Sequence, residues 1–140
     1  MGVTRAGGCQ CGRLRYRIAG EPKVVTACHC RECQRQSGSA FGMSAIVGCE
    51  QFVLETGEAR TFSRLGESGL SVEGAFCGDC GTRLYHRLER MPDTLNVKVG
   101  TLDDTSGLRP ALHVWVSSKQ SWLELPEGVP CFDRNPGDTS

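Results

Sequence analysis

The grouping of nine cysteines constrains what this chain can fold into more than any other feature. Seven of them form three short clusters, namely Cys9 and Cys11, then Cys28, Cys30 and Cys33, and then Cys77 and Cys80. Cysteines one or two residues apart can direct their sulfurs at one metal ion, and an odd total cannot pair completely in disulfides. Since no apolar signal region precedes them, we interpret the clusters as metal ligands of a protein in a reducing cytoplasm.

Charge and hydropathy exclude several other classes of protein. Sixteen basic and sixteen acidic side chains give a formal net charge of zero, and neither sign forms a long block. A nucleic-acid partner is therefore not expected, and no apolar run is long enough to cross a membrane. We expect residues 1–140 to form a single zinc-binding domain, with an irregular tail from about residue 127, where Pro130 and Pro136 interrupt regular structure.

The hydrophobic pattern predicts strands almost throughout. Apolar and polar residues alternate over 13–18, 70–76, 84–88 and 95–99, which is typical of half-buried strands. Shorter β-prone runs cover 24–27, 41–47, 52–54, 60–63 and 112–116. One helix of one or two turns is predicted over 31–36, ending at Gly38. Eight or nine short strands with almost no helix indicate an all-β fold, with the cysteine clusters at strand ends.

Two of the clusters have the form of half-sites for a structural zinc ion. Cys77 and Cys80 lie in the turn of a predicted β-hairpin, where Gly78 and Gly81 would occupy positive-φ positions. The glycines that flank Cys9 and Cys11 would let that segment turn tightly around the same ion. Spacing alone leaves the pairing open, because the first cluster could also join two of the central cysteines.

The central cluster supplies only three ligands, so a tetrahedral zinc site there is either open or completed by a distant residue. The candidates for a fourth ligand are His29, His86, His113 and Cys49. We expect the His29 side chain to point away from its cysteine neighbours, and His86 to be a hydrogen-bonded core residue. His113 fits either a pocket wall or a buried strand. Cys49 and Cys131 are predicted to be small buried apolar residues.

Motifs along the chain resemble those of the glutathione-dependent formaldehyde-activating enzyme family, which also takes in centromere protein V. They are Gly-Gly-Cys-x-Cys-Gly, Cys28-His29-Cys30-x-x-Cys33 with Ser37-Gly38-Ser39, Phe76-Cys77-x-x-Cys80-Gly81-Thr82, Gly100-Thr101-Leu102-Asp103 and His113-x-Trp115. The match extends from Gly7 to about Phe132. It implies a β-tent fold of short antiparallel strands that holds two zinc ions. By position, Cys9, Cys11, Cys77 and Cys80 correspond to a structural site, and Cys28, Cys30 and Cys33 to a catalytic one.

The resemblance further implies a carbon-sulfur lyase that adds glutathione, or a related thiol, to formaldehyde and gives S-hydroxymethylglutathione. Three thiolates with a free fourth position fit this chemistry, because zinc can bind a substrate thiol there and lower its pKa. The alternative is a non-catalytic zinc-binding interaction module with two structural zinc sites. Candidates for contacts to the substrate are Arg31, Arg35, Arg64 and Lys119, and Trp122 is expected either to cover a ligand or to close the core. The sequence sets no oligomeric state.

Overall fold

The computed structural model describes residues 3–66 and 68–136, which contain ten strands and one α-helix. The strands are β1 (Thr4–Gly8), β2 (Arg15–Ala19), β3 (Val24–Cys28), β4 (Gly42–Gly48), β5 (Phe52–Thr56), β6 (Arg60–Leu65), β7 (Ser71–Phe76), β8 (Arg83–Leu88), β9 (Met91–Lys98) and β10 (Leu112–Val114). The helical segments are α1 (Arg31–Ser37) and the short 3₁₀ turns η1 (Cys49–Gln51), η2 (Val99–Thr101) and η3 (Val116–Ser118). The predicted all-β class is confirmed.

The strands form two sheets. The smaller has the order β1-β2-β5, and the larger has the order β10-β3-β4-β9-β8-β7-β6. Neighbouring strands are antiparallel, as expected, except that β3 and β10 pair in parallel at one edge. Within the part of the chain that the structure describes, no helix has the length and apolar character needed to span a membrane.

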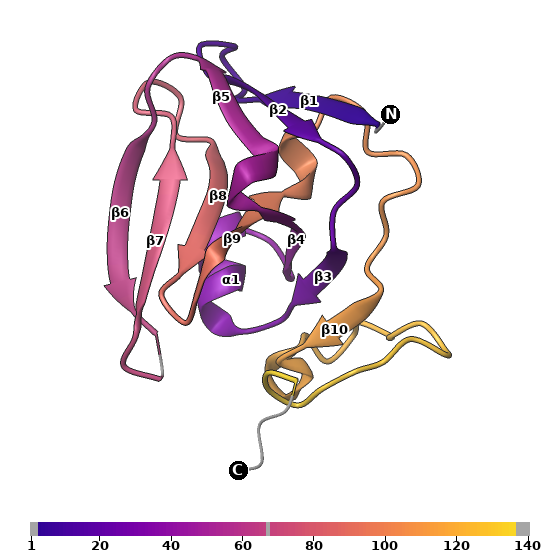
Figure 1. The fold of residues 1–140 in the computed structure, drawn as a ribbon. Helices are drawn as coiled ribbons and strands as arrows, with labels where there is room; N and C mark the ends of the chain where they lie inside the picture. The colour runs from indigo at the N-terminus through magenta and orange to yellow at the C-terminus, as the bar shows by residue number, and fades with distance from the viewer. Residues whose placement is uncertain (1–2, 67, 137–140) are drawn as a thin grey trace.

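The main hydrophobic core lies between the two sheets. Tyr16 and Ile18 of β2 are completely buried and pack in one cluster with Val47, Leu84 and Val97 of the larger sheet. These residues come from the predicted alternating runs, whose apolar faces therefore meet as the pattern indicates. In Figure 1 the small sheet lies at the top of the molecule, across the larger sheet.

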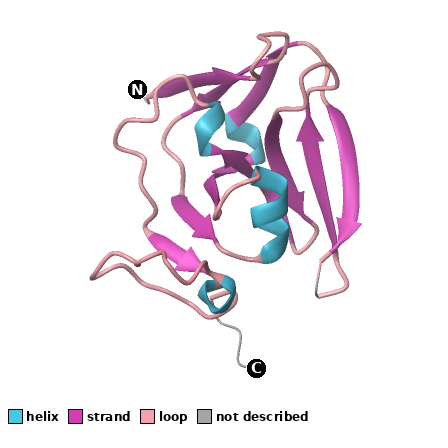
Figure 2. Cartoon of the chain, turned by 180° about the vertical axis from the view of Figure 1, so that it is seen from behind, coloured by secondary structure: helices cyan, strands magenta, loops and turns pink. Residues whose placement is uncertain are grey.

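Helix α1 lies between β3 on one side and β6 to β8 on the other, in both Figure 1 and Figure 2. Since these strands are far apart in the larger sheet, the sheet curves around the helix. The buried Gln34 side chain holds α1 in place by donating to the carbonyl oxygens of His29 at 2.8 Å and Ser118 at 3.0 Å. The helix ends at Gly38, whose φ of 63° is left-handed, as predicted.

Two details of the glycine prediction are wrong. Gly7 and Gly8 do not form a turn; they belong to strand β1, which the sequence did not indicate. Gly12 (φ 84°) makes the turn around the first cluster. In the hairpin, Gly81 has the expected positive φ of 83°, whereas Gly78 does not and instead lies against the Arg60 side chain.

The C-terminal segment is tied to the edge of the larger sheet. Strand β10 is shorter than predicted because Trp115 adopts a left-handed conformation, with φ of 57°, and ends it. The tail beyond Glu127 contains no helix or strand among its described residues, but its backbone bonds to β10 and η3. Phe132 donates to the His113 carbonyl oxygen at 2.9 Å and accepts from the Val116 amide at 3.0 Å.

Candidate metal centres

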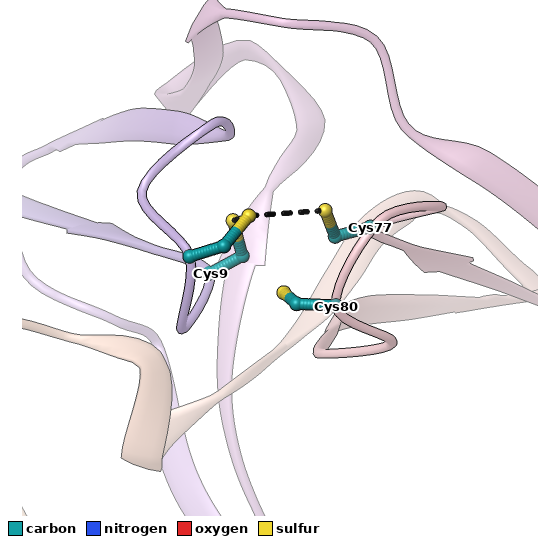
Figure 3. A group of neighbouring side chains, drawn as sticks. Cys9, Cys77 and Cys80 are labelled. Carbon is teal, nitrogen blue, oxygen red and sulfur yellow. Dashed lines mark hydrogen bonds between the residues drawn. The ribbon is translucent and has the colours of Figure 1, made fainter.

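The first and last cysteine clusters meet at one place. Cys9 and Cys11 lie at the β1–β2 turn, Cys77 and Cys80 at the β7–β8 turn, and all four sulfurs are within 4.8 Å of one another. Figure 3 shows Cys9 facing Cys77 and Cys80 from the opposite turn. Of the two pairings that spacing left open, the structure therefore brings together the one that the family resemblance implied.

The geometry of this cluster fits a tetrahedral zinc ion. The Cys9 and Cys11 sulfurs are 3.6 Å apart, and those of Cys11 and Cys77 are 3.8 Å apart. Sulfurs bound tetrahedrally at about 2.3 Å from zinc lie about 3.8 Å from one another, whereas a disulfide needs about 2.05 Å. All nine cysteines are free. The residues present therefore match a closed structural zinc site.

Hydrogen bonds to Cys9 and Cys80 favour the thiolate form of these two residues, whereas the pKa of Cys11, next to the other sulfurs, is raised to about 12. The Leu14 amide donates to the Cys9 sulfur at 3.2 Å, and the Thr82 hydroxyl lies 3.2 Å from the Cys80 sulfur. Hydrogen bonding from Thr82 lowers the pKa of the Cys80 thiol to about 5. Thiolate is the form in which cysteine binds a metal, so these contacts suit ligands.

The second cluster forms where β3 runs into α1. Cys28 ends the strand, Cys30 is the N-cap of the helix, and Cys33 lies in its first turn. Their sulfurs are also within 4.8 Å of one another. The Cys33 amide donates to the Cys30 sulfur at 3.3 Å, so the same cysteine that offers a sulfur to a metal caps the helix. Helix α1 therefore brings Cys33 next to Cys28 at the end of β3.

The pKa values of the three thiols in this cluster indicate that a cation is needed if all three are to be thiolates. Hydrogen bonding from Cys28 and Cys33 lowers the pKa of Cys30 to about 2. The same contact with Cys30 raises the pKa of Cys28 far above its ordinary value. One sulfur is therefore stabilised as a thiolate by keeping its neighbours protonated. Three thiolates together need a positive charge among them, which a bound zinc ion would supply.

No fourth His, Cys, Asp or Glu ligand joins these three sulfurs within residues 3–66 and 68–136. His29 points away from the cluster, as predicted, and its Nε2 lies 2.9 Å from His113 Nδ1. Both rings are buried, and burial lowers the pKa of each, so the pair is neutral at pH 7. His113 thus belongs to a buried strand, and neither histidine is placed to complete the site.

A cationic group that the sequence did not single out lies close to the second cluster. The ammonium group of Lys98 donates to His86 Nδ1 at 2.7 Å and lies 3.5 Å from the Ser44 hydroxyl. Burial lowers the pKa of Lys98 to about 8, and the nearby Cys33 opposes that shift. His86 is buried and hydrogen-bonded, as predicted. The only sequence signal for Lys98 is its place on the polar face of an alternating strand.

The structure places the remaining residues that the sequence singled out in different surroundings. Cys131 is exposed and Cys49 only half-buried, so the prediction that both are buried is wrong. Cys49 begins the 3₁₀ turn η1, and Cys131 lies in the C-terminal segment outside any named strand or helix. Trp122 is 69% exposed and does not close the core. Arg31 contacts Gln34 of its own helix, and the Lys119 ammonium donates to the Leu123 carbonyl oxygen at 2.9 Å.

The fold and the two clusters define an all-β protein with one closed and one three-cysteine candidate zinc centre. A profile of the family described as glutathione-dependent formaldehyde-activating enzyme matches residues 4–118. The chain therefore belongs to this family, as the sequence motifs indicated.

Two individual comparisons agree with this assignment. The chain is 23% identical over 140 residues to a Halomonas elongata protein whose provisional name is glutathione-dependent formaldehyde-activating enzyme. That alignment covers 95% of this chain and 89% of the relative. The crystal structure of a Rhodobacter sphaeroides protein superposes with a TM-score of 0.54 at 20% identity, covering 75% of this chain and 91% of that one. The similarity to the Rhodobacter sphaeroides structure shows only that the two proteins share a fold.

Proposed function

We propose that this protein is a zinc-dependent carbon-sulfur lyase of the cytoplasm that joins a thiol, such as glutathione, to formaldehyde or a related aldehyde. In the forward direction a bond forms between the thiol sulfur and the carbonyl carbon, and the carbonyl oxygen takes up a proton. The reverse reaction breaks the same carbon-sulfur bond. The observation that carries the proposal is the three-cysteine cluster, which has no fourth protein ligand within the described residues.

The two clusters would have different roles. Cys9, Cys11, Cys77 and Cys80 would hold a structural zinc ion, and Cys28, Cys30 and Cys33 a catalytic one. A zinc ion held by these three thiolates would supply a fourth position that lowers the pKa of a substrate thiol, whose proton would then be lost at neutral pH. The chain's own contribution is to fix the three sulfurs at the junction of β3 and α1, where the Cys33 amide orients Cys30.

Lys98 suits the charge that develops during this reaction. Addition of a thiolate to a carbonyl carbon moves negative charge onto the oxygen, and a partly buried cation stabilises such charge more strongly than an exposed one. The hydrogen bond to His86 holds the ammonium group in place on the face of the sheet that α1 covers. We propose that Lys98 stabilises this oxygen.

The rival proposal, a non-catalytic interaction module, requires a closed second site. The histidines suggested for it are accounted for by other contacts, His29 with His113 and His86 with Lys98. An enzyme therefore explains the three-cysteine cluster better than a second structural site does.

A thiol-adduct activity screen tests the proposal. Zinc-loaded protein should accelerate formation of S-hydroxymethylglutathione from glutathione and formaldehyde above the uncatalysed rate, or do so for another pair in a panel of thiols and aldehydes. The Cys33→Ser variant should lose this acceleration. A fully zinc-loaded protein that accelerates no pair in the panel would contradict the proposed activity.

A further inference from the structure

A pocket of about 200 Å³ opens between α1 and the strands β6 to β8. Glu32 and Arg35 line it from the helix, and Phe62, Arg64 and Arg83 are among the residues that line it from the strands. Helix α1 also carries Cys33, so the pocket and the three-cysteine cluster share this element. The charges of Arg83 and Cys33 are near enough to influence each other.

The pocket carries more positive than negative charge. Three arginines line it against a single carboxylate, that of Glu32. Glu32 is already engaged, because its two oxygens lie 3.4 Å from Arg35 and 3.7 Å from Arg64. The carboxylate therefore lies between these two arginines, and among the described residues no carboxylate pairs with the third.

Arg83 is the pocket arginine that has no ion-pair partner among residues 3–66 and 68–136. It is half-buried, yet within the described residues no acceptor receives a hydrogen bond from its guanidinium group. Burial lowers its pKa, and the charge of Arg64 lowers it further. Partly buried guanidinium groups normally bind acceptors, and the fork of an arginine matches a carboxylate. A bound anion would satisfy the donors and relieve the repulsion between the two arginines.

The position of Arg83 depends on Gly74, on the neighbouring strand β7. A Cβ atom at Gly74 would come within 3.0 Å of the Arg83 guanidinium group, so this group lies directly across the glycine. The absence of a side chain there gives the guanidinium group its place in the pocket wall. Phe62, on β6, adds an apolar surface on the same wall.

We propose that this pocket binds a carboxylate of the thiol substrate, with Arg83 as the main contact and Arg64 as a second. The inference rests on the proposed function and specifies its substrate class as thiols that carry a carboxylate. At this volume the pocket holds a carboxylate-bearing arm and not a whole tripeptide, so the sulfur end of the substrate extends along α1 toward the three cysteines.

Binding of S-methylglutathione tests the proposal without any chemistry, because its blocked sulfur cannot react. Calorimetry on the zinc-loaded protein should show that Arg83→Gln raises the Kd for S-methylglutathione by about tenfold or more, because a charge-assisted contact is lost. Arg90→Gln is the matched control, since Arg90 is an exposed arginine in the β8–β9 turn, outside the pocket. Its Kd should stay within about twofold of the wild-type value.

A second variant keeps the charge and moves the group. Gly74→Ala places a methyl group where the Arg83 guanidinium lies, so the flexible side chain must shift and S-methylglutathione binding should weaken, by less than in Arg83→Gln. If Arg83→Gln does not fold, Gly74→Ala alone decides. The proposal is overturned if the folded variants bind as tightly as the wild type, or if the wild type does not bind the probe.

The kinetic readout separates this inference from the proposed function. The ratio of kcat/KM for glutathione to kcat/KM for 2-mercaptoethanol, a neutral thiol, should fall about tenfold or more in Arg83→Gln. An active wild type whose ratio does not depend on Arg83 overturns the pocket alone. A wild type that is inactive with every thiol, yet binds S-methylglutathione through Arg83, overturns the lyase and supports the pocket.

Discussion

Gly7 occupies a place in the fold where a side chain has no room. A Cβ atom there would lie within 3.0 Å of both the Tyr16 hydroxyl and the Thr101 carbonyl oxygen. Tyr16 is completely buried, and its hydroxyl is fixed 2.7 Å from the Thr101 Oγ1. The strand that leads to Cys9 and Cys11 can therefore approach the core only with glycine at this position.

Replacing this glycine should destabilise the protein. Gly7→Ala should lower the free energy of unfolding by about 1–3 kcal/mol, because the added methyl group overpacks a closed contact. Chemical denaturation measures the change. Gly100→Ala is the control, since no atom lies within 4 Å of a Cβ there and its φ is not positive. Equal stability of Gly7→Ala and the wild type would show that the contact is not as close as described.

At the same scale, the sequence singled out the cysteines that the structure brings together, but not Arg83 or Lys98. Cysteines one or two residues apart come together through local spacing. The meeting of Cys9 and Cys11 with Cys77 and Cys80 depends on the fold, and only the family resemblance implied it. Arg83 and Lys98 are different, because they meet the second cluster only through the pairing of β7, β8 and β9. Strand register over that distance does not follow from the alternation of a single strand.

At the scale of elements, the strands that the sequence predicted best are those with the strictest alternation of apolar and polar residues. Strands β2, β7 and β8 alternate strictly and were predicted nearly to their ends. Strand β1 was missed because its residues Ala6, Gly7 and Gly8 have low β-propensity, and only pairing with β2 makes it a strand. The parallel pairing of β10 with β3 joins segments that are distant in the sequence, so no local sequence pattern predicts it.

The C-terminal segment should act as part of the sheet edge at β10. Its carbonyl oxygens accept hydrogen bonds from the amides of His113 at 3.0 Å, Trp115 at 3.1 Å and Val116 at 3.0 Å. Removing residues 129–140 should therefore raise amide exchange at these three positions by about tenfold or more, because exchange reports local opening. Hydrogen exchange with mass spectrometry measures this.

The amide of Tyr85, in the hairpin far from the tail, is the internal control for this truncation. Its protection should change little. Unaltered protection at 113, 115 and 116 would mean that the tail does not support this edge, and uniform loss of protection would mean that the truncated chain has unfolded globally.

For the molecule as a whole, the two metal centres should differ in how much stability they contribute. A metal ion in the four-cysteine cluster would tie the β1–β2 turn to the β7–β8 turn, while one in the three-cysteine cluster would join residues only a few positions apart. Cys80→Ser should cost several kcal/mol and lower the Tm by more than about 10 °C, because a structural zinc is part of the folding free energy. Cys33→Ser should lower the Tm far less while abolishing activity.

Melting curves of the two serine variants, recorded side by side with zinc analysis, check this difference. They are matched controls for each other, since each replaces one sulfur by oxygen in one candidate centre. A folded Cys80→Ser protein with the wild-type Tm would show that the first zinc is not structural. Equal and severe destabilisation by both substitutions would indicate that the central cluster is also a closed staple.

The zinc content of the wild-type protein tests the central claim most directly. Seven cysteines arranged as four and three should bind two zinc ions per chain, measurable by elemental analysis of protein purified without chelator. The account predicts a ratio of about two zinc ions to one chain, one for each tetrahedral centre. A single tightly held zinc ion per chain would contradict it, because the three-cysteine cluster would then not be the metal centre on which the proposed chemistry depends.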